Sequence, residues 1–379
     1  MIKLRKIFYW SPHINPQIAT VKAVINSAKS LNLYGKKNEI VIINVFGEWD
    51  DFKNILNSFN IKLINLTKIR KKLPIEGFLK SRLFYIFVSI VSILKLKKLL
   101  KKEKPDFLIS HLIVIPTLIL SRFYKTNTKF ILRISGLPNL NFFRKIAWRY
   151  FSNNIFAVTC PTLLTMDTLL ENKLFKKQNI HLLRDPIFNM LDLPKRRKKK
   201  IFYKNYALAI GRLTYQKNFE FLIKNYSEVL KMIDYKKLII IGSGENKNKL
   251  LNLIKLYDAE KYIEILDYQD NIDSFYKNAD CFILTSRWED PGFVLIEAAI
   301  NNIPIISNDS PNGPKEFIKN EINGISYRNF NNDDFKSKLI YLLKNLNSAE
   351  IAKKKIAAKL YAKQYSLLNH YRVLNKILS

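Results

Sequence analysis

Short apolar runs alternate with stretches of helical periodicity in the first half of the chain. A helix is predicted over residues 18–33, where apolar side chains recur at helical spacing. Strands are predicted at 7–10, 39–45, 107–110, 130–134 and 154–160. Strands buried on both faces of a parallel sheet show continuous apolar runs of this kind. The order of strands and helices therefore predicts an α/β, doubly wound domain.

The same alternation returns in the second half, after a basic segment. Six consecutive cations at 195–200 cannot be packed in a core and predict a solvated linker. Beyond them, strands are predicted at 206–211, 237–241, 261–266, 281–285 and 304–307, helices at 217–232, 271–277 and 293–300, and one continuous helix at 348–378.

This pattern divides the chain into two domains, residues 1–193 and residues 201–379. The C-terminal helix is free to pack back on the first domain. Ligands of doubly wound sheets bind at the carboxyl ends of the strands, so a cleft between the two domains is the expected binding place.

The amino-acid composition limits the classes of protein to which the chain can belong. Of 379 residues, 48% are apolar and 25% are charged, which is globular composition and excludes a disordered chain. The 64 Lys and Arg exceed the 31 Asp and Glu by 33, so an anionic partner is expected: nucleic acid, nucleotide phosphate or an acidic membrane.

The cysteines and histidines indicate whether the chain can build a metal site and in which cell compartment it lies. Two cysteines, Cys160 and Cys281, allow no disulfide framework and no Cys-rich metal site, which favours a reducing, cytoplasmic compartment. The four histidines are too scattered for a metal-ligand spacing, so no metal is expected. Neither a complete dinucleotide fingerprint nor a phosphate loop is present.

The longest apolar run, 83–94, is shorter than the roughly twenty residues that cross a bilayer as a helix. It lies in residues 71–104, where apolar side chains are followed by closely spaced lysines. Such a segment can lie in an anionic membrane interface, here the inner face of the cell membrane. The alternative is a helix buried against the first sheet with a solvated, lysine-rich end.

Residues suited to a nucleotide diphosphate follow two predicted strands of the second half. Gly211 and Arg212 end one strand, and Lys217 starts the next helix, while Gly242 and Gly244 end another strand. Glycines let backbone N–H groups approach phosphates, and the two cations supply fixed positive charge. Alternatively, the glycine pair simply closes a turn, Arg212 caps a neighbouring element and Lys217 is solvated.

Two carboxylates flank the start of the helix predicted at 293–300. Glu289 precedes it, in the sequence EDPGF, and Glu297 lies on its first turns. A carboxylate accepts two hydrogen bonds and therefore fits a vicinal diol of a sugar or ribose. Alternatively, Glu289 is an ordinary loop carboxylate and Glu297 is stabilised by the helix dipole.

Taken together, these segments resemble glycosyltransferase family 4, retaining enzymes with the GT-B fold. The resemblance covers residues 208–327 and is carried by GRLTYQKN at 211–218, by the Glu–seven residues–Glu motif within 286–298, and by PNGPKE at 311–316 with Asn323-Gly324. It implies two Rossmann-like, doubly wound domains that face a central cleft. The first domain would bind the acceptor and the second the nucleotide sugar.

The resemblance also implies a role for each matching residue. Glu289, Arg212 and Lys217 would be the catalytic residues: the two cations would hold the donor diphosphate and Glu289 the sugar hydroxyls. Glu297 would bind the ribose. The further donor-binding residues would be Gly211, Gly242, Gly244, Gly292, Phe293 and Val294. Such enzymes retain the anomeric configuration without a catalytic metal, and the leaving diphosphate helps to deprotonate the acceptor hydroxyl.

The first half departs from the family pattern. Ser11-Pro12-His13 stands where many relatives have a glycine pair, and Ser135 stands where many have the histidine of a His-Gly element. The acceptor-side candidates are therefore His13, His111, Arg133 and Ser135. For the two histidines a purely structural role is the alternative.

We expect a hexosyltransferase that uses a nucleotide-sugar donor, UDP-linked, and a glycan or lipid-linked acceptor in surface polysaccharide or lipopolysaccharide synthesis. Two other classes stay open: a nucleotide-sugar epimerase of the same fold, and a non-catalytic nucleic-acid-binding protein. The second would use the charge of +33, but the cations are spread along the whole chain. No nucleic-acid partner is therefore expected.

Overall fold

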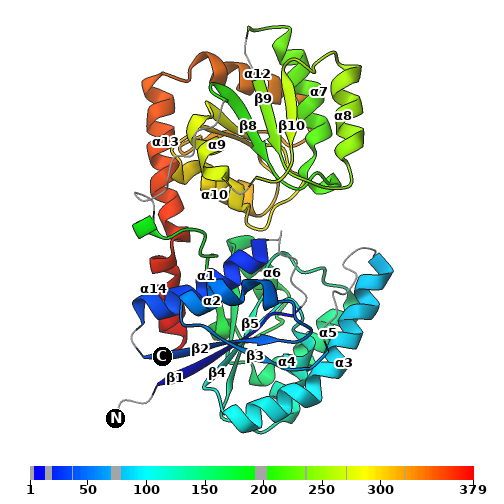
Figure 1. The fold of residues 1–379 in the computed structure, drawn as a ribbon, viewed down its shortest axis with the longest axis vertical. Helices are drawn as coiled ribbons and strands as arrows, with labels where there is room; N and C mark the ends of the chain where they lie inside the picture. The colour runs from blue at the N-terminus through cyan, green and yellow to red at the C-terminus, as the bar shows by residue number, and fades with distance from the viewer. Residues whose placement is uncertain are drawn as a thin grey trace. The chain divides into compact units, whose positions relative to one another are not determined.

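The computed structural model describes residues 4–12, 19–35, 37–69, 78–192, 203–234, 237–269, 271–319 and 321–379. The chain forms two units (Figure 1): unit 1 is Met1–Met190 with Tyr365–Ser379, and unit 2 is Leu191–Gln364. The last residues, sequence neighbours of unit 2, thus belong to unit 1. The basic segment 195–200 lies outside the described residues.

Unit 1 is built on a seven-stranded parallel sheet in the order β3-β2-β1-β4-β5-β6-β7. The strands are β1 (Arg5–Trp10), β2 (Asn38–Asn44), β3 (Lys62–Asn65), β4 (Phe107–His111), β5 (Lys129–Arg133), β6 (Ala157–Cys160) and β7 (Ile180–Leu182). Alternate residues point to opposite faces: Phe8 and Trp10 enter one core, Ile7 and Tyr9 the other. This two-sided burial explains the continuous apolar runs of the sequence.

Helices cover both faces of this sheet. One core includes residues of α3 (Phe78–Glu103), α4 (Ile115–Phe123), α5 (Phe142–Phe151) and α6 (Leu163–Glu171). The other includes residues of α1 (Ala19–Tyr34), α2 (Lys53–Ser58) and α14 (Leu367–Ile377). Helix α14 packs on α1 and buries Leu374 and Ile377, so the end of the chain completes the core of unit 1.

Unit 2 has a six-stranded parallel sheet in the order β10-β9-β8-β11-β12-β13. The strands are β8 (Tyr206–Ile210), β9 (Lys237–Ile241), β10 (Ile263–Leu266), β11 (Cys281–Leu284), β12 (Ile305–Asn308) and β13 (Ile325–Tyr327). The helices are α7 (Phe219–Leu230), α8 (Lys247–Leu256), α9 (Ile272–Asn278), α10 (Phe293–Ile300), α11 (Gly313–Phe317), α12 (Asn332–Lys344) and α13 (Ala349–Ala362). Short 3-10 turns lie at Asp50–Phe52, Ser152–Asn154, Lys177–Asn179, Met190–Asp192, Tyr215–Lys217 and Lys363–Tyr365.

The prediction of one continuous helix at 348–378 was wrong. Helix α13 ends at Ala362, and α14 begins at Leu367 after a 3-10 turn. Ser366 starts the new helix, because its hydroxyl accepts a hydrogen bond from the backbone N–H of Asn369 at 3.3 Å. The break lies where the chain passes from unit 2 back to unit 1.

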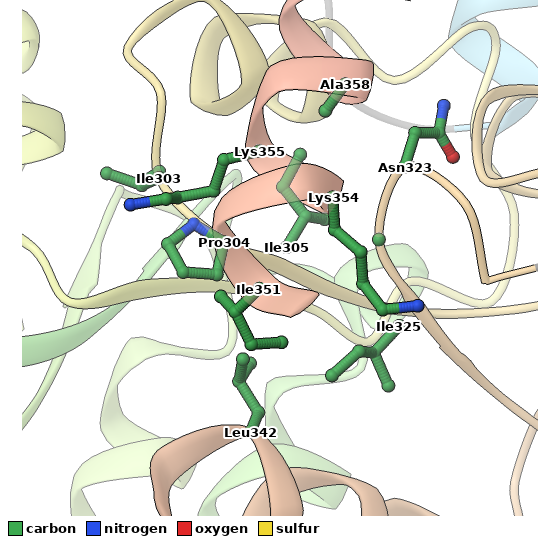
Figure 2. Close-up of a pocket in the computed structure, with 11 residues that line it drawn as sticks. Ile303, Pro304, Ile305, Asn323, Ile325, Leu342, Ile351, Lys354, Lys355 and Ala358 are labelled. Atoms are coloured by element: carbon green, nitrogen blue, oxygen red, sulfur yellow. The ribbon is translucent and has the colours of Figure 1, made fainter. Parts of the chain in front are cut away.

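A small apolar pocket lies between α13 and the sheet of unit 2. Figure 2 shows Ile305, Ile325, Leu342 and Ile351 converging on it, with lysines of α13 beside them. Its volume of about 10 Å³ is close to the space that one water molecule needs. It therefore holds no substrate.

Two further properties concern the whole described chain. Both cysteines, Cys160 and Cys281, are buried free thiols. Among the described residues, no helix combines the length and the apolar character needed to cross a bilayer.

Candidate functional site

The strand order of unit 2 reverses between the neighbouring strands β8 and β11. In doubly wound sheets, ligands bind at the carboxyl ends of the strands at such a reversal. The loop after β8 carries Arg212 and Lys217, and the loop after β11 carries Glu289. The fold therefore brings the three residues predicted as catalytic to one edge of one sheet.

Lys217 and Glu289 form a buried ion pair at this edge. Lys217 Nζ contacts Glu289 Oε1, and the two side chains are 11% and 7% exposed. Ser286 Oγ donates a hydrogen bond to the same Oε1 at 2.6 Å. With two donors on Oε1, Glu289 Oε2 is the carboxylate oxygen left for another hydrogen-bond donor.

Arg212 is exposed and joins this pair through Gln216. Arg212 Nη2 donates to Gln216 Oε1 at 3.0 Å, and Gln216 Nε2 donates to the carbonyl of Trp288 at 2.9 Å. The carbonyl of Gln216 accepts from the N–H of Arg287 at 2.8 Å. Gln216 therefore connects the loop of Arg212 to the loop of Glu289, a role that its sequence position did not reveal.

Arg287 is a second connection between the same loops. Its guanidinium lies 4.0 Å from the ring centre of Tyr215 and 5.0 Å from that of Phe330. Its Nη2 donates to Asn218 Oδ1 at 3.0 Å. Cation–π contacts of this kind stabilise by about 0.5–1 kcal/mol each at exposed sites. Sequence reasoning missed Arg287, because both aromatic partners are distant in the chain.

The glycines after β8 and β9 permit close contact between their loops. A Cβ at Gly242 would lie 1.8 Å from the carbonyl oxygen of Gly211, and one at Gly244 would lie 2.5 Å from that of Leu213. A Cβ at Gly211 would lie 2.8 Å from Lys217 Cε. Protein atoms already fill this space, which supports the alternative that Gly242 and Gly244 serve the packing of the two loops.

The loop after β12 supports Glu289 from the other side. The N–H of Gly313 donates to the Glu289 carbonyl at 3.2 Å, and Asn312 Nδ2 donates to Asp290 Oδ1. A Cβ at Gly313 would lie 1.8 Å from the carbonyl oxygen of Pro291. The PNGPKE segment therefore serves to position the loop of Glu289.

The remaining predicted donor-binding residues lie at the start of α10. Gly292 has a φ of +87°, a conformation that glycine adopts without strain, and Phe293 and Val294 follow as the first, half-buried helical residues. Glu297 Oε2 accepts a hydrogen bond from Tyr276 Oη of α9 at 3.2 Å. Glu297 is thus placed beside α9, whereas Lys217 and Glu289 contact each other and Arg212 is linked to their loops through Gln216.

The acceptor-side candidates belong to unit 1 and have unequal surroundings. Arg133 ends β5, is 4% exposed, pairs with Asp185 and donates to the Leu183 carbonyl at 2.9 Å. His111 is 1% exposed, and neither of its ring nitrogens has a hydrogen-bond partner in the described part of the chain. Ser135 is half-buried in the loop after β5. His13 lies outside the described residues.

A buried hydrogen-bond chain runs beside these residues. His370 Nδ1 donates to the Arg184 carbonyl at 2.7 Å, so its Nε2 accepts from Ser27 Oγ at 2.8 Å, and Ser27 accepts from Tyr9 Oη at 2.9 Å. Burial lowers the pKa of His370 to about 3, with the positive charge of Arg133 acting in the same direction. Burial also holds the pKa of His111 well below its usual value.

Acidification is therefore expected to destabilise unit 1. Below pH 6.5 the unfolded chain takes up a proton at residue 370 and the folded chain does not, so stability is complete above this pH and is lost as the pH falls toward 3. Between pH 6.5 and about pH 5 the loss from His370 alone is about 2 kcal/mol. Denaturant unfolding across this range should show it, and His370→Gln should flatten the slope. An equal slope in both proteins would contradict the prediction.

Groups of three or more His, Cys, Asp or Glu side chains that could hold a metal ion do not occur among the described residues. The polar groups gathered at the carboxyl ends of β8 and β11 are instead cations, hydroxyls and one carboxylate. Their chemistry suits an anionic ligand that also carries hydroxyl groups.

Comparison with known proteins supports a glycosyltransferase. Residues 193–359, most of unit 2, match the family described as Glycosyl transferases group 1. An uncharacterized glycosyltransferase of Methanocaldococcus jannaschii is 31% identical over 266 residues, 64% of this chain and 65% of that protein. The amylovoran biosynthesis glycosyltransferase AmsD of Erwinia amylovora is 39% identical over 139 residues, 37% of this chain and 38% of that protein.

The aligned segment thus spans less than two thirds of the length of both relatives. A longer alignment joins this chain to an uncharacterized glycosyltransferase of Haemophilus influenzae, 27% identical over 359 residues, 90% of this chain and 91% of that protein.

Solved structures extend the similarity to both units. A glycosyltransferase from Rickettsia africae has a TM-score of 0.78 at 19% identity, with 100% of this chain and 98% of that chain covered. Anabaena HepE in complex with UDP has a TM-score of 0.75 at 13% identity, with 98% and 99% covered. Both solved structures share the fold of this chain over nearly its whole length, so the two Rossmann-like, parallel-sheet domains expected from the sequence are confirmed.

Proposed function

We propose that the chain is a retaining, metal-independent hexosyltransferase of glycosyltransferase family 4. It takes a hexose from a nucleotide donor, UDP-linked, to a glycan or lipid-linked acceptor in surface polysaccharide or lipopolysaccharide synthesis. The observation that carries this proposal is the buried Lys217–Glu289 pair at the strand reversal of unit 2, with Arg212 on the same loop as Lys217. The polysaccharide named for the Erwinia relative and the UDP bound by HepE support the substrate classes.

Each residue at this edge has a role in the proposal. Arg212 and Lys217 hold the diphosphate and stabilise the negative charge that grows on it as the sugar leaves. Glu289 accepts hydrogen bonds from sugar hydroxyls at Oε2, since its Oε1 is already occupied. Backbone N–H groups at Gly292 and Phe293 contact phosphate and sugar.

In the transfer step, the bond between the anomeric carbon and the diphosphate oxygen breaks. The acceptor hydroxyl attacks the same face of the sugar, and a diphosphate oxygen takes up its proton. The new glycosidic bond therefore keeps the anomeric configuration. Glu297 binds the ribose, which leaves the two cations to act on the diphosphate.

The acceptor is assigned to unit 1, at the carboxyl edge that carries His111, Arg133 and Ser135. In this proposal residues 71–104 contact the anionic inner face of the cell membrane, and of these the structure describes residues 78–104. Helix α3 supports it, because Ile86, Ile90 and Leu94 follow one another at helical spacing and are 55%, 66% and 69% exposed. Lysines accompany them along the same helix.

A ligand panel followed by a transfer assay tests this function. UDP, GDP, CMP and their sugars are compared by thermal shift, where a nucleotide at a hundred times its Kd adds about 2.7 kcal/mol of stability. The linkage of the transferred sugar is then read by proton NMR. Inversion of the anomeric centre, or isomerisation of the donor with no acceptor present, would contradict the proposal. So would the absence of nucleotide binding together with steeply salt-dependent binding to any nucleic acid.

Arg212→Ala is expected to weaken the binding of the nucleotide diphosphate by about tenfold to a hundredfold, since a charge-assisted hydrogen bond is lost. Because Arg212 is exposed, the stability of unit 2 should change by less than about 0.5 kcal/mol. Isothermal titration with UDP measures the affinity, and Lys255→Ala, an exposed cation of α8, is the matched control. Unchanged affinity in Arg212→Ala would remove Arg212 from the site.

A further inference from the structure

Helix α5 presents its apolar side chains to solvent rather than to the core. It buries one large side chain, Trp148, whereas Phe142 and Phe143 are 72% and 80% exposed and Ile146 and Tyr150 about half exposed. Residues 143, 146 and 150 are spaced by three and four positions and therefore share one face of the helix. An ordinary surface helix turns its apolar side chains to the core and its polar side chains to solvent, so this arrangement is the reverse.

The exposed face continues onto the neighbouring helix. The ring of Phe151 contacts that of Tyr150 at 5.0 Å and that of Phe123, at the end of α4, at 6.0 Å. Phe123 is 66% exposed. We call this surface the α5 patch, formed by Phe123, Phe142, Phe143, Ile146 and Tyr150.

Cations lie on the helices that form the α5 patch. Helix α5 itself carries Arg144, Lys145 and Arg149 and has no Asp or Glu, and the Arg122 guanidinium lies 5.3 Å from the ring centre of Tyr150. Residues 78–151, which include α3, α4 and α5 and the strands β4 and β5 between them, contain 15 Lys or Arg and 2 Asp or Glu. Helix α4 contacts both α3 and α5, so the three helices form one basic layer on one face of the sheet (Figure 1).

Exposed aromatic rings accompanied by cations match the interface of an anionic bilayer. Aromatic side chains occupy the boundary between headgroups and acyl chains, while Lys and Arg extend to the phosphates. An apolar patch of this kind marks an interaction surface, and the excess of positive charge selects anionic lipid as the partner.

We propose that the α5 patch inserts into the interface of an anionic membrane and orients unit 1 on it. Helix α5 starts after the loop that follows β5, so Phe142 and Phe143 lie toward the carboxyl edge of the sheet, the ligand edge of such folds. A lipid-linked acceptor at that edge would then be delivered from the membrane itself. This consequence rests on the proposed function, whereas the membrane binding does not.

Vesicle sedimentation of the full chain tests the proposal without any substrate. The native chain is expected to bind vesicles of phosphatidylcholine with phosphatidylglycerol and to remain in solution with phosphatidylcholine alone. Each cation near an anionic surface contributes about a fivefold factor in partitioning, so Arg144→Gln with Lys145→Gln should lower binding by about thirtyfold. Phe142→Ser with Phe143→Ser should lower it by tenfold or more, since two large rings no longer insert.

Helix α13 offers a matched control in unit 2. Ile356 and Leu360 are 57% and 55% exposed on a helix that also carries Lys353 and Lys359, so Ile356→Ser with Leu360→Ser also removes two exposed apolar groups beside cations. This variant is expected to bind like the native chain. Equal loss in both serine variants, or full binding by the Phe142–Phe143 variant, would overturn the proposal.

Two further outcomes assign the patch to another partner and would also overturn the proposal. In the first, sedimentation shows a dimer that the Phe142–Phe143 variant abolishes, while anionic vesicles are not bound. In the second, the patch variants lose RNA binding instead of vesicle binding. Sugar transfer to a soluble acceptor is assayed in parallel, so a failed vesicle experiment leaves the proposed transfer reaction standing, and the reverse also holds.

Discussion

Glu289→Gln is expected to lower the rate of sugar transfer by about two to three orders of magnitude, because the carboxylate proposed to bind the donor sugar is lost. It is also expected to lower the free energy of unfolding of unit 2 by about 3–5 kcal/mol, since the ammonium of Lys217 is left buried without its partner. Initial rates with the nucleotide sugar and denaturant unfolding measure the two effects separately.

The double variant Lys217→Met with Glu289→Gln separates the effect on sugar transfer from the effect on the stability of unit 2. Methionine fills a similar volume without a charge, so the double variant should recover most of the lost stability. Transfer should remain low, because both groups proposed to contact the donor are gone. Recovery of transfer together with stability would show that the pair serves only the folding of unit 2.

Gly242→Ala is expected to lower the free energy of unfolding by about 3 kcal/mol or more. The reason is that the new Cβ meets backbone atoms rather than a flexible side chain. The new Cβ would lie 1.8 Å from the Gly211 carbonyl oxygen, so the loop that carries Arg212 and Lys217 must move. Nucleotide affinity should fall with it. Both quantities can be measured by thermal unfolding with and without UDP.

Ser243→Ala is the control for this variant, since Ser243 lies between the two glycines and its hydroxyl has no hydrogen bond to any residue that the structure describes. Its stability should stay within about 0.5 kcal/mol of the native chain. A stable Gly242→Ala protein with native nucleotide affinity would mean that the contact between the two loops does not position the site.

Most central strands could be predicted from the sequence, because burial on both faces leaves an uninterrupted apolar run. The edge strands β3, β7 and β13 were missed, since they are short and β3 has no buried residue. The helix predicted from 217 begins instead at Phe219, because Asn218 adopts a φ of +54° that ends the preceding turn. Such conformations are settled by tertiary contacts rather than by local pattern.

The candidate site was predicted by residue type but not by contact. Parallel strands deliver Arg212, Lys217 and Glu289 to one edge, yet the ion pair depends on β8 lying next to β11, which no local pattern reveals. In unit 1, Arg133 was a candidate for the acceptor side, and its partner Asp185 is 52 positions away. A buried cation needs an anionic partner. Because Asp185 lies far from Arg133 in the sequence, the sequence alone does not show that Arg133 is part of this pair.

The return of α14 to unit 1 has a consequence for how the protein is made. Unit 2 is continuous from Leu191 to Gln364, so all of its strands leave the ribosome before residues 365–379 are synthesised. Unit 1 lacks Leu374 and Ile377 until then, and its core beside Ile7 and Tyr9 stays open during translation. The half of the molecule that is made first is therefore the half that completes its folding last, the reverse of the usual vectorial order.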